Sequence, residues 1–182
     1  MSDRETLRKL IDKLAIQRGE FTLVSGAKAS YYIDCRKVTL DSCGANLIGK
    51  LIYEKLLQGD FPEAAGGMAI GADPITGSVV AYAGSRDRQL SGFIVRKEAK
   101  THGTGKMVEG PIVAGQSAVI LEDVVTSGGS SLKAIQLAQD AGLVIKGVIC
   151  IVDRLAGGRE VFEKEGYSLE SLFTIEDFGL AN

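Results

Sequence analysis

Two adjacent acids and a loop rich in hydroxyl groups and glycine are the residues of this chain best suited to chemistry. Glu122 and Asp123 follow the apolar run Ala118–Leu121, and residues 126–131 read Thr-Ser-Gly-Gly-Ser-Ser. A helix that begins in this loop would offer free backbone N–H groups and a partial positive charge to an anion. Neighbouring carboxylates repel each other, and a vicinal diol would relieve this because each carboxylate can accept hydrogen bonds from its hydroxyls. The pattern therefore predicts a phosphate site beside a diol site.

Two alternative explanations account for less of this stretch. A solvated loop with Asp123 as a helix cap would explain neither the second acid nor the two glycines. A nucleoside triphosphate loop would need Lys followed by Ser or Thr, and no stretch of the chain matches GxxxxGKS or GxxxxGKT.

A second candidate is the segment 96–106, which follows an apolar run but contains almost no hydrophobic residue. Its cations are Arg96, Lys97, Lys100 and Lys106. Against them stands the single acid Glu98, and the segment also holds His102, the one histidine of the chain. Composition alone favours a solvated basic loop, whereas the histidine and its neighbouring glycines fit a lid that closes over a polyanion.

Two further pairs of residues have an ordinary structural explanation when they are taken alone. Tyr31 and Tyr32 fall in a predicted strand, where one ring would point inward and the other outward. Asp153 and Arg154 follow the apolar run Val144–Val152 and could form a structural ion pair.

The elements that must position these residues alternate along the chain. Short, nearly continuous apolar runs predict strands buried on both faces at Met68–Ile70, Phe93–Val95, Ala118–Leu121 and Val144–Val152. Helical patterns separate most of them, at Ile75–Ala83, Ser130–Ala141 and Arg159–Glu165. Such alternation predicts an α/β fold with a doubly wound, mostly parallel sheet, in which ligands bind at the carboxyl edge of the strands.

The first 35 or so residues break this alternation. Ser2 and Glu5 have the spacing of a capping box for a helix, and Gly19 is a plausible stop. Residues 21–34 predict two short strands around a turn at Gly26, and a second helix is expected over Asp41–Leu56. We expect one domain over residues 1–182, in which residues 1–35 form a helix and a small hood over the carboxyl edge of a core formed by residues 36–182.

Composition limits the class of protein. The 182 residues are 45% hydrophobic and 24% charged, and the net charge of −2 gives no basic field for nucleic acid or membranes. No apolar run approaches the roughly 20 residues of a membrane span. Three widely spaced cysteines without a CxxC pair predict neither disulfides nor a zinc site. The charged N-terminus lacks the apolar core of a secretory signal, so we expect a cytoplasmic protein that binds neither nucleic acid nor membrane.

The stretch 119–131, VILEDVVTSGGSS, closely resembles the 5-phosphoribosyl-1-diphosphate (PRPP) binding motif of type I phosphoribosyltransferases. The resemblance implies the fold of that family. It also implies that Glu122 and Asp123 hold the ribose 2′- and 3′-hydroxyls, with Asp123 among the catalytic residues. The remaining PRPP contacts that it implies are Val124, Val125, Thr126, Ser127, Gly128, Gly129 and Ser130, of which 126–130 wrap the 5′-phosphate.

Three other segments are similar to orotate phosphoribosyltransferases. The sequence RKEAKTHG at 96–103 resembles their catalytic loop, and GAKASYYID at 26–34 resembles their N-terminal hood. The loop resemblance implies PRPP contacts from Arg96, Lys97, Lys100 and His102, of which Lys100 and His102 would be catalytic. The hood resemblance implies that Lys28 lies near the acceptor and the transferred group and is catalytic. It also implies that Tyr31 or Tyr32 covers the pyrimidine, while Arg154 receives the orotate carboxylate and Thr126 also contacts orotate.

This resemblance implies a reaction and its partners. Orotate N1 would attack ribose C1 of PRPP with inversion, giving orotidine 5′-monophosphate and pyrophosphate in pyrimidine biosynthesis. Mg²⁺ would be held mainly by substrate and water, with no metal site made by the protein alone. A homodimer is expected, in which the loop 96–106 reaches the neighbouring active site. One departure concerns the pyrophosphate loop at 71–77, where many members carry a lysine and this chain has Asp73 and Pro74.

Two other functions stay open on the sequence. A phosphoribosyltransferase for a purine or uracil would share 119–131 but should lack the RKExKxHG pattern and the Lys28 hood. A regulator that senses PRPP without catalysis would need a nucleic-acid surface, of which the net charge of −2 gives little sign.

Overall fold

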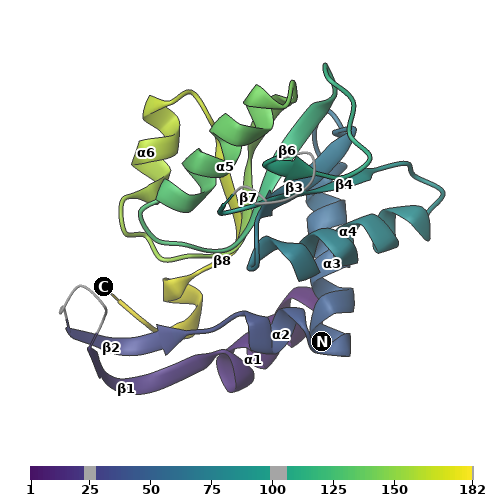
Figure 1. The fold of residues 1–182 in the computed structure, drawn as a ribbon. Helices are drawn as coiled ribbons and strands as arrows, with labels where there is room; N and C mark the ends of the chain where they lie inside the picture. The colour runs from purple at the N-terminus through teal and green to yellow at the C-terminus, as the bar shows by residue number, and fades with distance from the viewer. Residues whose placement is uncertain (23–27, 99–105, 182) are drawn as a thin grey trace.

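The computed structural model describes residues 1–22, 28–98 and 106–181. Their elements form a six-stranded sheet flanked by helices and a separate two-stranded hairpin (Figure 1). In chain order the elements are α1 (Asp3–Leu14), β1 (Ile16–Thr22), β2 (Lys28–Ile33), α2 (Arg36–Thr39), α3 (Ser42–Leu56), β3 (Ala64–Met68), α4 (Ala72–Gly84), β4 (Ser91–Val95), β5 (Val108–Glu109), β6 (Ser117–Val125), α5 (Gly129–Asp140), β7 (Val144–Asp153), α6 (Gly158–Lys164), β8 (Leu169–Thr174) and the 3₁₀ helix η1 (Ile175–Phe178).

The large sheet has the order β5-β4-β3-β6-β7-β8, and every neighbouring pair is parallel except β4 with β5. This confirms the predicted mostly parallel α/β sheet. Pairing of β6 with β7 places Glu122 beside Cys150 and Val125 beside Asp153. The acids on β6 and Arg154, which directly follows β7, therefore lie at the same carboxyl edge.

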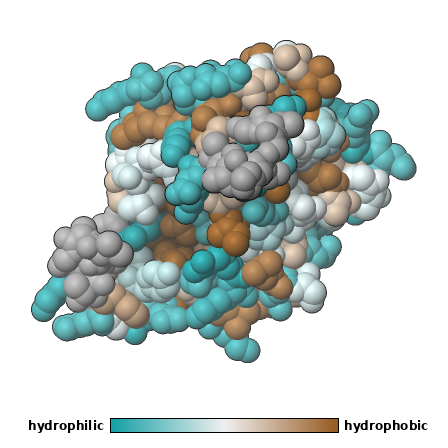
Figure 2. Space-filling view, in the orientation of Figure 1, coloured by the Kyte–Doolittle hydropathy of each residue, from teal (hydrophilic) through white to brown (hydrophobic). Residues whose placement is uncertain are grey.

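Helices cover both faces of the sheet (Figure 1). Residues from α1, α3 and α4 form one hydrophobic cluster with the sheet, and residues from α5 and α6 form the other. Burial on both faces explains the nearly continuous apolar sequences of β6 and β7, because neither face of these strands meets water. On the face shown in Figure 2, apolar and polar residues are mixed in small patches, as expected when the large apolar side chains lie inside.

The strand β3 differs from its prediction in position and composition. The apolar run at Met68–Ile70 predicted a strand there, but β3 is Ala64–Met68 and Ile70 is 65% exposed. Its two glycines explain why the sequence signal was weak. A Cβ at Gly66 would lie 2.0 Å from the Phe93 oxygen, and one at Gly67 would lie 2.1 Å from the Leu121 oxygen. Neighbouring backbones therefore exclude the branched side chains that normally mark a strand.

The N-terminal region contains the predicted helix and hairpin with shifted boundaries. Ser2 caps α1 by accepting a hydrogen bond from the Glu5 amide, but the helix ends at Leu14, so the predicted stop at Gly19 is wrong. Gly19 lies inside β1 because the chain leaves the helix at Ala15 to pair with β2 in antiparallel register. The turn predicted at Gly26 lies outside the described residues. The second helix is confirmed as α3, with Asp41 as its cap.

Other differences lie at the edges of the sheet. The strand predicted to end at the acids continues to Val125, so Glu122 and Asp123 lie within β6. The sequence analysis missed β5, β8 and the one-turn helix α2. Short elements such as β5, of two residues, carry too little periodicity to be recognised.

Candidate active site

A cavity of about 320 Å³ opens at the carboxyl edge of the sheet, between the β1–β2 hairpin and the ends of β3 and β6. Its wall combines residues that are far apart in the sequence. The described residues that line it are Tyr32, Ile33, Asp34, Arg36, Met68, Ala69, Ile70, Gly71, Lys97, Glu122, Asp123, Val124 and Ser130. The acids, one residue of the hydroxyl loop and the hood thus meet around one space.

Glu122 is the buried member of the acid pair, with 7% of its surface exposed. One carboxylate oxygen accepts a hydrogen bond from the Ser131 hydroxyl at 2.9 Å, across the loop from β6 to α5. Burial, followed by repulsion from Asp123, raises the pKa of Glu122 to about 7. The pair therefore carries less than two full charges near neutral pH in the absence of a partner.

Asp123 is the more accessible acid and lines the cavity directly. Its Oδ1 accepts a hydrogen bond from the Val124 amide at 2.9 Å, which fixes the side chain. The β3–α4 loop packs tightly on the other side, because a Cβ at Gly71 would lie 2.9 Å from Asp123 Oδ1. A side chain at 71 would therefore displace the carboxylate that faces the cavity.

The hydroxyl loop leads directly into α5, as the phosphate-site prediction requires. Gly128 occupies the N-cap with a φ of +79°, a conformation that favours glycine, and α5 starts at Gly129. The backbone is confined further because Gly158 approaches it: a Cβ there would lie 2.8 Å from the Thr126 oxygen. Thr126, Ser127 and Ser130 are exposed, so their hydroxyls and the first amides of α5 are accessible to an anion.

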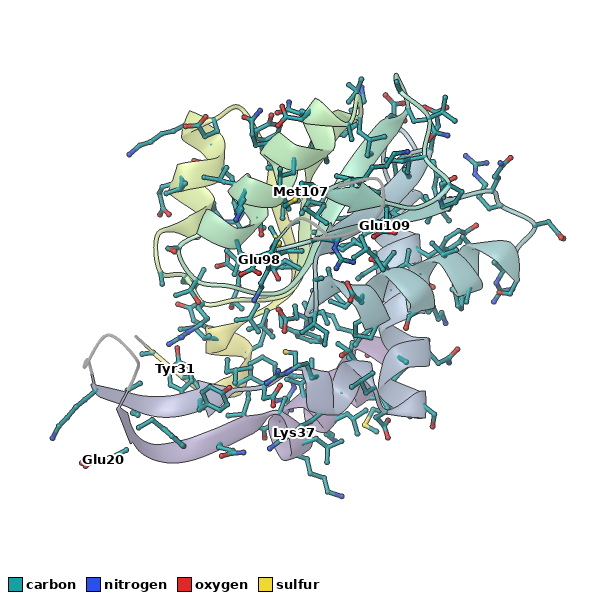
Figure 3. All side chains as sticks on the ribbon, in the orientation of Figure 1. Glu20, Tyr31, Lys37, Glu98, Met107 and Glu109 are labelled. Carbon is teal, nitrogen blue, oxygen red and sulfur yellow. The ribbon has the colours of Figure 1, made fainter. Side chains whose placement is uncertain are left out.

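The two hood tyrosines have different environments. Tyr31 is buried and accepts a hydrogen bond from Arg154 Nε at 3.2 Å, and the guanidinium carbon lies 4.9 Å from its ring centroid. Figure 3 shows Tyr31 on the hairpin strand β2. Tyr32 is 42% exposed and lines the cavity. The expected alternation of one ring in and one out is confirmed, and Tyr32 is the ring available to a ligand.

Arg154 directly follows β7 and donates from Nε to the Tyr31 hydroxyl, and it is not among the described residues that line the cavity. Asp153, which is fully buried, pairs with Arg159 at 3.1 Å and accepts a hydrogen bond from the Leu155 amide at 2.9 Å. The structural ion pair considered for Asp153 thus exists, but its recorded partner is Arg159. Lys28, at the start of β2, is exposed and is not among the described residues that line the cavity.

The basic segment is only partly described, and Lys100 and His102 lie outside the described residues. Lys97 lines the cavity. Arg96 does not line it; its guanidinium pairs with Glu109 of β5 at 3.2 Å. Figure 3 labels Glu98, which follows β4, and Glu109 on β5.

The structure adds residues that the sequence analysis missed. Asp34 and Arg36 form an ion pair at 2.7 Å and both line the cavity, as does the exposed Ile70. A DxR spacing in a short segment carries no distinctive signal, so only the fold reveals it.

Asp73 does not line the cavity; its buried Oδ1 has no partner in the described parts of the chain, and burial raises its pKa.

Relatives of known identity were found for nearly the whole chain. The orotate phosphoribosyltransferase of Rhodopirellula baltica is 55% identical over 98% of this chain and 95% of its own length. The chain belongs to the orotate phosphoribosyltransferase family. No protein-family model matches it.

Solved structures of the orotate phosphoribosyltransferase family have the same fold. The Mycobacterium tuberculosis enzyme in complex with Fe(III) dicitrate superposes with a TM-score of 0.88 at 38% identity, over 98% of this chain and all of that one. The same enzyme in complex with PRPP gives 0.84 at 35% identity, with the same shares of both chains covered. In the described residues of the present chain, no helix is both long and apolar enough to cross a membrane.

Proposed function

We propose that this member of the family transfers the 5-phosphoribosyl group of PRPP to N1 of orotate, giving orotidine 5′-monophosphate and pyrophosphate. The observation that carries this is the convergence of the acid pair and the α5 phosphate loop on one cavity that the hood also lines. A 5-phosphoribosyl group requires a diol site and a phosphate site within a few ångströms. The chain would thereby act in the synthesis of pyrimidine nucleotides.

The ribose end is assigned to β6 and the loop after it. Glu122 and Asp123 accept hydrogen bonds from the 2′- and 3′-hydroxyls, which favours their ionised forms. Backbone amides and hydroxyls between Val124 and Ser130 surround the 5′-phosphate at the N-terminus of α5, where the helix dipole favours an anion.

The acceptor end is assigned to the hood and the end of β7. Arg154 receives the orotate carboxylate through its bidentate guanidinium. The Tyr31 hydroxyl holds this guanidinium by accepting a hydrogen bond from Nε. Tyr32 covers the flat ring, and Thr126 supplies a further polar contact. Lys28 contributes a positive charge from the edge of the hood.

Catalysis then depends on the charges that change at ribose C1. Breaking the C1–O bond gives the ribose oxocarbenium character, which the Asp123 carboxylate stabilises. Lys97, Lys100 and His102, with Arg96, neutralise the departing diphosphate from the segment 96–106 and exclude water from the site. Arg96 must exchange its pairing with Glu109 for the substrate to do this.

Mg²⁺ is the cofactor that this site best suits. The described ranges contain no group of three or more acids, histidines or cysteines that could hold a metal. In this proposal Mg²⁺ would be held mainly by diphosphate and ribose oxygens and by water, as is usual for this ion. Glu122 and Asp123 at the ribose site suit such a substrate-bound cation. The metal neutralises charge on the leaving group when bound.

The assembly and the compartment belong to the same proposal. In the proposed homodimer the segment 96–106 would reach the neighbouring active site and serve the diphosphate bound there. A cytoplasmic location is supported by three cysteines that form no disulfide.

The experiment that tests the function is incubation of the chain with PRPP, Mg²⁺ and, separately, orotate, uracil, adenine and hypoxanthine. Formation of orotidine 5′-monophosphate and pyrophosphate only with orotate supports the proposal. Product from another base would indicate a different phosphoribosyltransferase. Binding of PRPP without product from any base would indicate the sensing function.

A further inference from the structure

The cavity has an unusual balance of charges for a site that binds a diphosphate. Its described lining contains the acids Asp34, Glu122 and Asp123, against the two cations Arg36 and Lys97. The β3–α4 loop forms part of the wall, and residues 69–77 contain no lysine, arginine or histidine. The 5′-phosphate has the α5 loop, but the diphosphate at C1 needs cations on a different wall.

Arg36 is placed on that wall. It directly follows the buried residue Cys35. Burial is the main cause that raises the pKa of the Cys35 thiol, and the charge of the nearby Asp123 raises it further. The pKa of Arg36 is raised chiefly by its bond to Asp34, and the charge of Asp123 contributes as well. A Cβ at Gly71 would lie 2.9 Å from Asp123 Oδ1, and Arg36, Gly71 and Asp123 all line the cavity, so the β3–α4 loop forms its wall beside Asp123.

The guanidinium of Arg36 is held in one orientation and keeps free donors. Its Nε donates to Asp34 Oδ1 at 2.7 Å and its Nη2 to Oδ2 at 3.2 Å, while the Arg36 amide also donates to Oδ1 at 3.2 Å. Within the described ranges, Asp34 is its recorded partner, so Nη1 and the second hydrogen of Nη2 are available. The Arg36 side chain is 49% exposed at the cavity, so a ligand can reach it. An arginine fixed in this way loses little conformational freedom when it binds phosphate oxygens.

We propose that Arg36 binds the diphosphate of PRPP and of the pyrophosphate product, as the cation that the β3–α4 loop does not supply. The proposal rests on the proposed function, because it takes the acid pair as the ribose site. Asp123 holds the ribose next to C1, so a cation beside Asp123 meets the group bonded to C1. The 5′-phosphate is assigned to the α5 loop instead.

The test compares three ligands on Arg36→Gln by calorimetric titration in the presence of Mg²⁺. Pyrophosphate and PRPP should bind about 10- to 100-fold more weakly than to the wild type, the range expected for lost charged hydrogen bonds. Ribose 5-phosphate, which lacks the diphosphate, should bind within about threefold of wild type. In the assay, the KM for PRPP should rise with little change in the KM for orotate.

Lys37→Gln is the matched control. It removes the same charge from the next residue of α2, and Lys37 is exposed without lining the cavity. Figure 3 labels it on this helix. Its pyrophosphate affinity should stay within about twofold of wild type, because an exposed charge is screened by salt. Arg36→Lys keeps the charge without the bidentate geometry and should give an intermediate affinity, and it serves as the test variant if Arg36→Gln does not fold.

Three outcomes would overturn the proposal. Unchanged pyrophosphate affinity in a folded Arg36→Gln would exclude the contact. An increase in the KM for orotate alone would place Arg36 at the acceptor, and equal weakening of all three ligands would assign it a general structural role. Failure of the wild type to make orotidine 5′-monophosphate would instead refute the proposed function, so the two failures are distinguishable.

Discussion

Glu122 combines a buried position with a partner of like charge, and this has a consequence for stability. Its pKa is raised from 4.5 to about 7 by burial and by Asp123. Between these two pH values the folded chain keeps a proton that the unfolded chain has released. The free energy of unfolding therefore falls as the pH rises through this window, because the folded state binds more protons.

Glu122→Gln should remove this dependence, since a neutral amide does not titrate. Between about pH 5 and pH 8 the wild type should lose on the order of 3 kcal/mol of stability through this group, and the variant should lose correspondingly less. Urea unfolding across the range measures the difference. Glu20→Gln, an exposed change in the hairpin, should keep the wild-type slope. Parallel curves for wild type and Glu122→Gln would show that Glu122 is ionised throughout.

Tyr31 supports Arg154 from the hood without lining the cavity itself. Tyr31→Phe keeps the ring under the guanidinium but removes the hydroxyl that accepts from Nε. We expect the KM for orotate to rise about three- to tenfold, with the KM for PRPP unchanged, because one hydrogen bond is worth about 1 kcal/mol. Arg154→Ala should raise the KM for orotate further. Steady-state kinetics with each substrate varied in turn measures both, and equal effects on the two substrates would contradict the assignment.

At the scale of elements, the junction between β6 and α5 determines the site. The strand carries the acids, the turn at Gly128 starts the helix, and Ser130 in the first turn of that helix lines the same cavity. A Cβ at Gly128 would lie 3.0 Å from the Phe162 ring of α6, and the φ of +79° disfavours any side chain.

Gly128→Ala should therefore lower the free energy of unfolding by about 1–2 kcal/mol and weaken PRPP binding as the loop shifts. Gly129→Ala is the control for stability, since a Cβ there meets nothing within 4 Å and its φ is not in the left-handed region. Chemical denaturation and calorimetry measure the two effects. Equal stability of the two variants would mean that the backbone at 128 adapts without cost.

At the scale of the whole molecule, the proposed dimer can be tested by complementation. Lys100→Ala chains lack the lysine proposed to neutralise the departing diphosphate. Chains with Glu122→Gln and Asp123→Asn lack the ribose site. Each homodimer should therefore be inactive. If the segment 96–106 serves the neighbouring site, mixed dimers contain one site made wholly of intact parts. Activity should return to about a quarter of wild type per total site for random pairing in a two-fold dimer. A mixture that stays inactive after proven subunit exchange would place the segment in its own chain's site.

The sequence by itself determined the parts of this protein that depend on local order. The acids, the glycines and the hydroxyls of 119–131 are contiguous, so their chemistry follows from one strand, one turn and one helix start. The parallel sheet was also predictable, because burial on both faces leaves continuous apolar runs in β6 and β7.

Only the tertiary structure decided which distant residues join that site. Tyr31 meets Arg154 across 123 positions of sequence, and Arg36 reaches the wall beside Asp123 because the hairpin lies over the carboxyl edge. The strand β3 was misplaced in the sequence analysis because the backbones of neighbouring strands leave room only for glycine at two of its positions. These glycines give no apolar pattern that marks a strand. A local pattern of residues determines the backbone conformation of its own segment, whereas a contact between distant segments depends on where the packed core places them.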